Sequence, residues 1–357
     1  MAFWQSIFGN AACLGIDIGT TSIKIAEVAE SSSIFHLKNY GLLESYGHLE
    51  RLNDAIQTSS LKLFERETVN LLVTLLKQVK PSTKNVVASI PPFSSFVTLL
   101  EMPMMSDADT SKGMSFQVRQ YIPLPVSEVA IDWLKVGEKE DENGIKKQQV
   151  LLISVPNEQI KKYQMIFKSA GLNLVSLEIE GLALTRMLIN GDQTPTLIMD
   201  IGARSTNLLI TDQGHLKLSA QTDFAGGTLT QAVASGLNIN VKRAEELKKL
   251  RGLLGSGGEY ELSTLMFPYL DAIIGEAKRL KIRYETEYAG KVERVILAGG
   301  CANLPGIQAY VGEQLGLPAS KANPFSHISY PNNLEPIIGD LGPMFGVALG
   351  LALRGLV

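Results

Sequence analysis

An acidic residue, a glycine and three small hydroxyl residues form the stretch of this sequence best suited to chemistry. Asp17 lies in an apolar run, Gly19 follows it, and alternating apolar residues continue beyond the hydroxyl residues. Alternation on both sides of a glycine turn is typical of a β-hairpin. Small side chains let the backbone of such a turn approach a phosphate, and the carboxylate is then placed to hold a hydrated Mg2+. The predicted phosphate contacts of this hairpin are Gly19, Thr20, Thr21 and Ser22.

Lys24 follows the same turn and has two interpretations. It is either a charge partner in the phosphate site or an ordinary solvated strand residue.

The same pattern returns, without a gap, about half the chain further on. Asp200 and Gly202 take the places of Asp17 and Gly19. A single turn aspartate often only caps its own backbone. Two matching hairpins instead indicate two similar halves that face each other across a nucleotide cleft, with Asp17 and Asp200 both beside Mg2+ through water. The residues predicted to contact phosphate from the second copy are Gly202, Ser205 and Thr206.

A third motif lies late in the chain, where a buried strand from Val295 ends in Gly299-Gly300 and a helix start follows. Such a turn lets a flat base and a ribose lie against bare backbone. The three motifs in this order resemble the actin, Hsp70 and sugar-kinase superfamily of ATP-binding folds. The resemblance implies an α/β, actin-like ATPase fold of duplicated ribonuclease-H-like lobes, with ATP and Mg2+ as ligands. It adds Gly226, Gly227, Gly299, Gly300 and Asn303 to the predicted nucleotide site.

Three charged residues take roles from this superfamily resemblance. Glu180 opens a predicted helix between the halves, where bacterial actin relatives use a Glu or Gln to orient the attacking water; alternatively, it only stabilises the helix dipole. Glu245 and Lys248 lie in a charged helix, where the superfamily uses a Glu and a Lys for the ribose hydroxyls and the adenine. A charge run on a helix is otherwise usually a solvated face.

Composition restricts the class of protein. The chain has 357 residues, 45% of them apolar, enough for two lobes, and its net charge of −3 argues against nucleic acid as the main partner. Cys13 and Cys301 lie far apart, so a disulfide framework and metal binding by cysteine are not expected. The start of the chain lacks the features of a signal peptide, and no apolar run has the length of a membrane span, so we expect a cytoplasmic protein. Phe3 to Phe8 predict a short amphipathic helix, either docked on the protein or serving as an interfacial anchor.

The predicted elements divide the chain into four parts. A strand over 95–102, a helix from residue 106 or 107, a hairpin over 130–136 and 147–155 and a helix over 157–170 form an α+β insert. The predicted divisions are residues 1–88, 166–195 and 337–357 for the first lobe (1A), 89–165 for the inserted 1C-like subdomain, 196–226 and 294–336 for the second lobe (2A), and 227–293 for its subdomain (2B).

Four segments give the sequence a closer resemblance, to the PilM family of actin-like type IV pilus assembly proteins, itself similar to the cell-division protein FtsA. The segments are Gly15-Ile-Asp17-Ile-Gly19, Arg119-Gln-Tyr121-Ile-Pro123-Leu-Pro125 with Asp132, Met199-Asp200-Ile-Gly202-Ala203, and Gly342 to Arg354. The resemblance implies an FtsA-like insert and a groove around residues 121–126 for the N-terminal cytoplasmic tail of the inner-membrane protein PilN. It also implies contacts with other pilus assembly components and recruitment to the inner membrane through the partner. Gly181 stands where relatives often have proline, which weakens the role of Glu180.

We therefore predict an ATP-dependent scaffold in which ATP clamps the two lobes and any hydrolysis is slow or absent. Two alternatives remain at this point. A small-molecule kinase of the same superfamily would need a further catalytic aspartate beyond Asp17 and Asp200. A filament-forming bacterial actin homologue is compatible with the same motifs.

Overall fold

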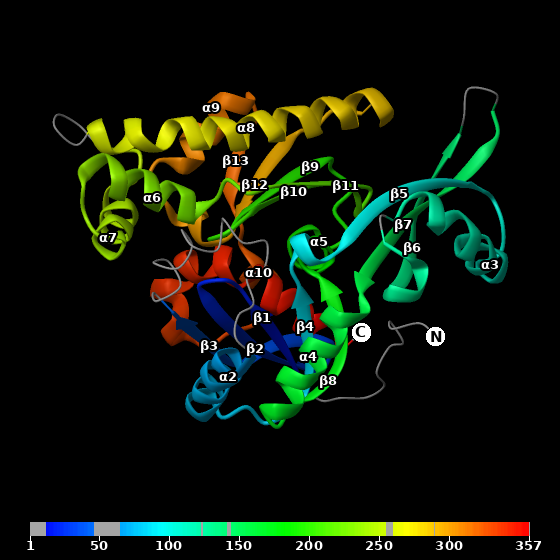
Figure 1. Ribbon diagram of the computed structural model, residues 1–357, viewed down its shortest axis with the longest axis horizontal. Helices are drawn as coiled ribbons and strands as arrows, with labels where there is room; N and C mark the ends of the chain where they lie inside the picture. The colour runs from blue at the N-terminus through cyan, green and yellow to red at the C-terminus, as the bar shows by residue number, and fades with distance from the viewer. Residues whose placement is uncertain are drawn as a thin grey trace.

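Two five-stranded sheets with the same strand order form the body of the protein (Figure 1). The computed structural model describes residues 12–45, 65–122, 124–140, 144–254, 260–288 and 290–356, so the helix predicted at Phe3 to Phe8 lies outside the described residues. The first sheet has the order β3-β2-β1-β4-β8 and the second β11-β10-β9-β12-β13. The strands of the first sheet are β1 (Ala12–Ile18), β2 (Ser22–Ser31), β3 (Ile34–Glu44), β4 (Asn85–Ile90) and β8 (Asn173–Ile179). Those of the second are β9 (Thr196–Ile201), β10 (Thr206–Asp212), β11 (His215–Thr222), β12 (Arg294–Ala298) and β13 (Ala319–Lys321).

The strand pairing repeats from one sheet to the other. β1 is antiparallel to β2 and parallel to β4, and β9 is likewise antiparallel to β10 and parallel to β12. Even the hairpin turns match, because the N–H of Gly19 donates to the Ser22 carbonyl at 2.9 Å and that of Gly202 to the Ser205 carbonyl at 3.1 Å. The predicted duplication is therefore present in the backbone.

Two helices lie between the sheets, α5 (Glu180–Ile189) and α10 (Ile338–Arg354) (Figure 1). α10 packs on β1 and β2, α5 on β10 and β11, and the two helices pack on each other. A Cβ added at Gly350 would lie 2.1 Å from the Ala183 carbonyl oxygen, so the glycine is what lets the two helix backbones meet. These helices separate the two sheets, and the N-terminus of α5 lies at the cavity described below.

The last helix is longer than the predicted range of 342–354, since α10 begins at Ile338 and contains Pro343. A proline removes one backbone donor but does not prevent the turn before it from being helical. Residues 332–354 meet the length and composition expected of a membrane-crossing helix, but most of this stretch is buried inside the protein. A buried core helix passes the same test, so the finding is weak evidence for a span.

The remaining helices cover the outer faces. α2 (Glu65–Val79) and α4 (Asn157–Ser169) pack beside the first sheet, and α8 (Tyr260–Tyr288) runs along the second. α6 (Gly226–Leu237), α7 (Val241–Arg251) and α9 (Ile307–Leu315) complete the second half (Figure 1). One apolar core lies beneath α2 and α4 and continues between the sheets to residues of the second half, and another lies beneath α8 and α9.

The predicted insert forms a separate three-stranded sheet with the order β5-β7-β6. It contains β5 (Phe96–Pro103), α3 (Asp107–Gln117), β6 (Val129–Glu140) and β7 (Lys146–Pro156), and Ser106 caps α3 as predicted. Its own apolar core includes Met102, Val118 and Leu152. α4, by contrast, packs on α2 and β8 of the first half. The residue boundaries of the four subdomains stay a prediction.

A buried lysine joins the insert to the second half. Lys217 on β11 donates from Nζ to the carbonyl oxygen of Val136 at 2.7 Å and to Oε1 of Gln149 at 3.0 Å. Only 2% of Lys217 is exposed. The insert is therefore tied to the second sheet as well as to the first half that carries it.

Candidate functional site

One cavity of about 460 Å3 lies between the two hairpins. Its size is in the range of small-molecule sites. Among the predicted site residues, only Thr206 is missing from its lining. The predicted residues that line it are Asp17, Gly19, Thr20, Thr21, Ser22, Lys24, Glu180, Asp200, Gly202, Ser205, Gly226, Gly227, Glu245, Lys248, Gly299, Gly300 and Asn303.

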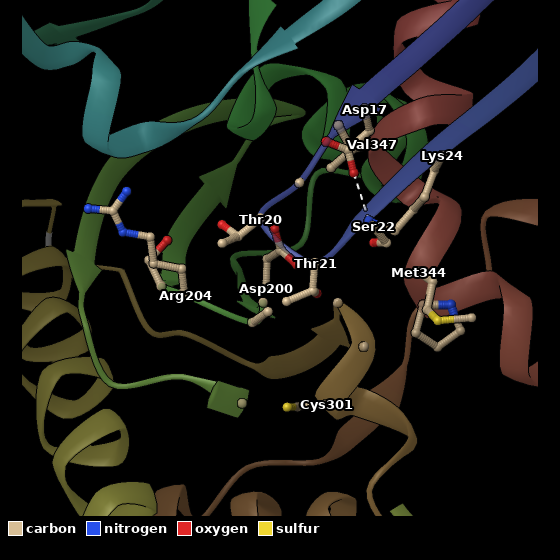
Figure 2. Close-up of a pocket in the computed structure, with 18 of the residues that line it drawn as sticks. Asp17, Thr20, Thr21, Ser22, Lys24, Asp200, Arg204, Cys301, Met344 and Val347 are labelled. Carbon is tan, nitrogen blue, oxygen red and sulfur yellow. Dashed lines mark hydrogen bonds and ion pairs between the residues drawn. The ribbon is translucent and has the colours of Figure 1, made fainter. Parts of the chain in front are cut away.

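The first aspartate is held by two partners. Lys24 Nζ lies 2.9 Å from Oδ2 of Asp17, and the Ser89 hydroxyl donates to Oδ1 at 2.9 Å (Figure 2). Lys24 stands directly opposite Asp17 in the β1–β2 pairing. Burial works against the charged ammonium, but the charge and hydrogen bond of Asp17 outweigh it and raise the pKa of Lys24. Lys24 is therefore not an ordinary solvated strand residue, because its side chain is largely buried and paired with Asp17.

Two further carboxylates face this pair. Burial, then the negative charges of Asp17 and Asp200, raise the pKa of Glu180 well above its ordinary value. Burial and the charge of Asp17 likewise raise the pKa of Asp200 to about 6, although Lys24 opposes the shift. The cluster therefore holds more negative charge than Lys24 can compensate, which is the electrostatic setting in which a bound cation is favourable.

The small hydroxyl residues of the first turn reach the cavity as predicted for phosphate contacts. Figure 2 shows Thr20, Thr21 and Asp200 gathered near Asp17. Thr206 differs, since it is fully buried and its hydroxyl donates to the Phe224 carbonyl at 2.7 Å. The period-2 alternation of β10 explains this, because Thr206 points to the opposite face from Ser205 and Asn207.

Glycines shape the end of the cavity predicted to take adenosine. Gly299 has φ +80°, and a Cβ there would lie 2.5 Å from the Ile201 carbonyl oxygen and 2.6 Å from Oδ1 of Asp200. A Cβ at Gly226 would lie 2.6 Å from Sγ of Cys301. Gly300 faces open space. The backbone at this end is therefore bare, as a base and ribose would need.

Glu245 and Lys248 are cross-linked at the same end. Their side chains form an ion pair at 2.6 Å, and Lys248 also donates to the Gly226 carbonyl at 2.9 Å and to Thr230 Oγ1 at 2.8 Å. Burial opposes ionisation of Glu245, but Lys248 and Thr230 outweigh it and lower its pKa. This network connects α7 to the first turn of α6. Glu245 and Lys248 are therefore buried and bonded, and do not belong to a solvated charged face.

The cavity also contains residues that sequence reasoning missed. Arg204, in the second hairpin turn, stacks its guanidinium over the Phe93 ring, 4.2 Å from the centroid. Asn207 lines the wall opposite Asp200, at the position that Lys24 occupies in the first copy. The repeat itself carried the signal for Asn207, because both residues follow the turn at the same offset. No pattern in the sequence around Phe93 pointed to a place in this cavity.

The donor set suits a nucleotide with its metal. Carboxylates with raised pKa values would be stabilised by a divalent cation, and the two glycine turns and hydroxyl residues offer phosphate ligands. The bare backbone at Gly299 leaves room that a side chain would fill. The residues present therefore fit Mg2+ with a nucleoside phosphate.

The duplicated sheets and the cavity between them define an actin-like ATPase fold, as predicted. The structure superposes on EutJ, an ethanolamine utilization protein of Carboxydothermus hydrogenoformans, with TM-score 0.57 and 16% identity over 98% of this chain and 91% of that one. MreB5 of Spiroplasma citri, solved with ADP, gives TM-score 0.54 and 14% identity over 96% and 95%. These similarities show the fold alone.

The chain belongs to the family of the type IV pilus assembly protein PilM, whose sequence profile matches residues 15–356. It also superposes on a solved PilM–PilN type IV pilus biogenesis complex with TM-score 0.83 and 22% identity, over 97% of this chain and 98% of that one. FtsA of Enterococcus hirae is 22% identical over 91% of this chain and 84% of FtsA. The predicted PilM resemblance and its FtsA-like relationship are confirmed.

Proposed function

We propose that this protein is an ATP-binding scaffold of type IV pilus assembly, located in the cytoplasm and recruited to the inner membrane by a membrane partner. The convergence of both hairpins and the Gly299-Gly300 turn on one cavity carries the nucleotide part of the proposal. Thr20, Thr21, Ser22 and Ser205 bind the phosphates. Glu245 and Lys248 hold the ribose and adenine end.

Asp17 and Asp200 would hold Mg2+, which would supply charge neutralisation at the phosphates. Glu180, at the N-terminus of α5, orients a water toward the terminal phosphate. Hydrolysis would depend on the placement of Glu180, which is followed by Gly181 where relatives often have proline. We therefore expect hydrolysis to be slow or absent.

The partner of the insert is the N-terminal cytoplasmic tail of PilN. A PilM–PilN complex is among the solved structures that this chain resembles. Tyr121 and Leu124, which lie between α3 and β6 of the insert, are 44% and 42% exposed and offer apolar surface. Oδ2 of Asp132 is buried without a hydrogen-bond partner among the described residues. An exposed apolar surface suits a short peptide that brings apolar side chains, and the insert separately offers a buried acceptor on β6 to an N–H donor.

Calorimetric titration with a synthetic PilN-type N-terminal peptide, with and without Mg-ATP, tests this proposal. We expect binding, with an affinity that changes when ATP is present. Leu124→Ser should weaken it about tenfold, because one buried leucine contributes about 1.5–3 kcal/mol. Leu254→Ser is the matched control, since Leu254 is 69% exposed and lies in the second half. Absence of peptide binding while ATP still binds would contradict the pilus partner and leave only the nucleotide site.

A further inference from the structure

The side chain of Arg204 bridges the second phosphate hairpin and the start of the insert. Arg204 lies in the turn between β9 and β10, two residues after Gly202, and lines the cavity. Its guanidinium lies 4.2 Å from the centroid of the Phe93 ring. Phe93 belongs to a single 3-10 turn, η1 (Pro92–Ser94), which connects β4 of the first sheet to β5 of the insert. The contact therefore joins the two halves within the lining of the cavity.

The other cations of the cavity are paired with carboxylates. Lys24 is paired with Asp17 at 2.9 Å, Lys248 with Glu245 at 2.6 Å and Lys249 with Glu44 at 3.3 Å. No carboxylate forms an ion pair with Arg204 among the residues that the structure describes. Arg204 is thus the lining cation whose contact can be given up most cheaply, because a partly exposed cation–π contact is weak.

The orientation of Arg204 selects one part of a nucleotide. In Figure 2 its side chain points away from Cys301, which adjoins the adenosine-side Gly300, and extends beyond Asp200. A nucleotide whose base lay against Gly299-Gly300 would therefore bring its terminal phosphate nearest to Arg204. Guanidinium binds phosphate oxygens through two parallel charge-assisted hydrogen bonds, a stronger interaction than stacking on a phenyl ring.

We propose that Arg204 recognises the terminal phosphate of a nucleoside triphosphate. Its guanidinium leaves the Phe93 ring and binds that phosphate instead. Release of Phe93 frees η1 and the beginning of β5, so the insert responds to the triphosphate and not to the diphosphate. This inference rests on the proposed nucleotide function and assigns its triphosphate specificity to one residue. A ligand can shift a conformation only through a difference in affinity, and the exchange supplies that difference.

Titration of the purified full chain with Mg-AMPPNP and, separately, with Mg-ADP tests the proposal. Arg204→Ala should weaken AMPPNP binding about tenfold or more and change ADP binding by less than about twofold. Retained ADP binding also reports that the variant is folded. Arg283→Ala, an exposed arginine on α8 paired with Glu287 at 2.8 Å, is the matched control and should change neither affinity. Arg204→Lys should fall between the two, since lysine keeps the charge but not the planar pair of donors.

Hydrogen exchange of Phe96–Pro103 provides the second measurement. In the wild type, AMPPNP but not ADP should increase exchange in this strand, whereas Phe93→Ala should show the higher rate without nucleotide. Equal loss of both affinities in Arg204→Ala, or no loss of either, overturns the proposal while leaving the nucleotide site intact. Failure of the wild type to bind either nucleotide overturns the proposed function itself, and this inference with it.

Discussion

Nζ of Lys24 lies 2.9 Å from Oδ2 of Asp17, directly across the first hairpin. In the second hairpin the corresponding position opposite Asp200 is the neutral Asn207. The backbone is duplicated, but the charge is not. Asp17 is neutralised by Lys24 on the neighbouring strand, whereas Asp200 faces the uncharged Asn207 across its own hairpin. A bound cation would therefore be most favourable beside Asp200.

The Lys24–Asp17 pair should contribute strongly to folding. Its side chains are 14% and 7% exposed, so Lys24→Met leaves a buried carboxylate without its partner. We expect the free energy of unfolding in urea to fall by about 3 kcal/mol. Lys135→Met, which removes an exposed pair with Glu138, should change the free energy of unfolding much less, because solvent screens that pair. Adding Asp17→Asn to Lys24→Met should restore part of the loss; no restoration would show that the charge of Asp17 is not responsible.

Asp200 should make the stability of the nucleotide-free protein depend on pH. Burial and Asp17 raise its pKa to about 6, above the ordinary 3.8. The unfolded chain therefore releases this proton at lower pH than the folded protein does, and stability decreases as the pH rises through about 4 to 6. Asp200→Asn should raise the free energy of unfolding by about 2 kcal/mol at pH 7.5 and by about half as much at pH 5.

The same variant should lose affinity for Mg-ATP, so stability and binding should change in opposite directions. Asp192→Asn is the control, because folding raises the pKa of Asp200 but lowers that of Asp192. Its backbone hydrogen bond from Thr194 lowers the pKa of Asp192 to about 2, so an amide there should not stabilise the protein at pH 7.5. A lower free energy of unfolding for Asp200→Asn at pH 7.5 would contradict the claim that burial and Asp17 disfavour the charged form of Asp200.

Two neighbouring glycines should respond differently to alanine. At Gly299, φ is +80° and a Cβ would lie 2.5 Å from the Ile201 carbonyl oxygen, so Gly299→Ala should destabilise the protein by at least about 2 kcal/mol. At Gly300 a Cβ would meet nothing within 4 Å, and Gly300→Ala should change stability by less than about 0.5 kcal/mol. Thermal unfolding of the two variants side by side measures the difference. Equal melting temperatures would show that the turn can rearrange.

Lys217 should control how firmly the insert is held. Lys217→Met removes the bonds to Val136 and Gln149, leaving buried acceptors unpaired at a cost of about 1–3 kcal/mol. We expect hydrogen exchange to increase in β6 and β7 while β9 and β10 stay protected. Lys38→Met, at an exposed position of β3, should leave both regions unchanged. Uniformly faster exchange throughout the protein would indicate general destabilisation in place of a local connection.

Local patterns in the sequence predicted the elements and most of the residues that line the cavity. Asp17 and Asp200 could be predicted because neighbouring residues encode apolar alternation and a glycine turn. The second copy of the pattern favours a ligand site over an ordinary turn. The insert and its hairpin followed from the same periodicity. α10 begins at Ile338, four residues before the predicted Gly342, because tertiary packing extends the helix before Pro343.

Only the tertiary structure decided which side chains meet. Thr206 was predicted in the phosphate site, but it lies on the other face of β10 and bonds to Phe224. Arg204 and Phe93 are far apart in sequence and come together only because the segment that leads into the insert lines the cavity. The raised pKa values of Glu180 and Asp200 likewise depend on burial and on charges brought from three separate segments. Contacts between distant segments are set by packing and burial, which a local pattern of residues does not contain.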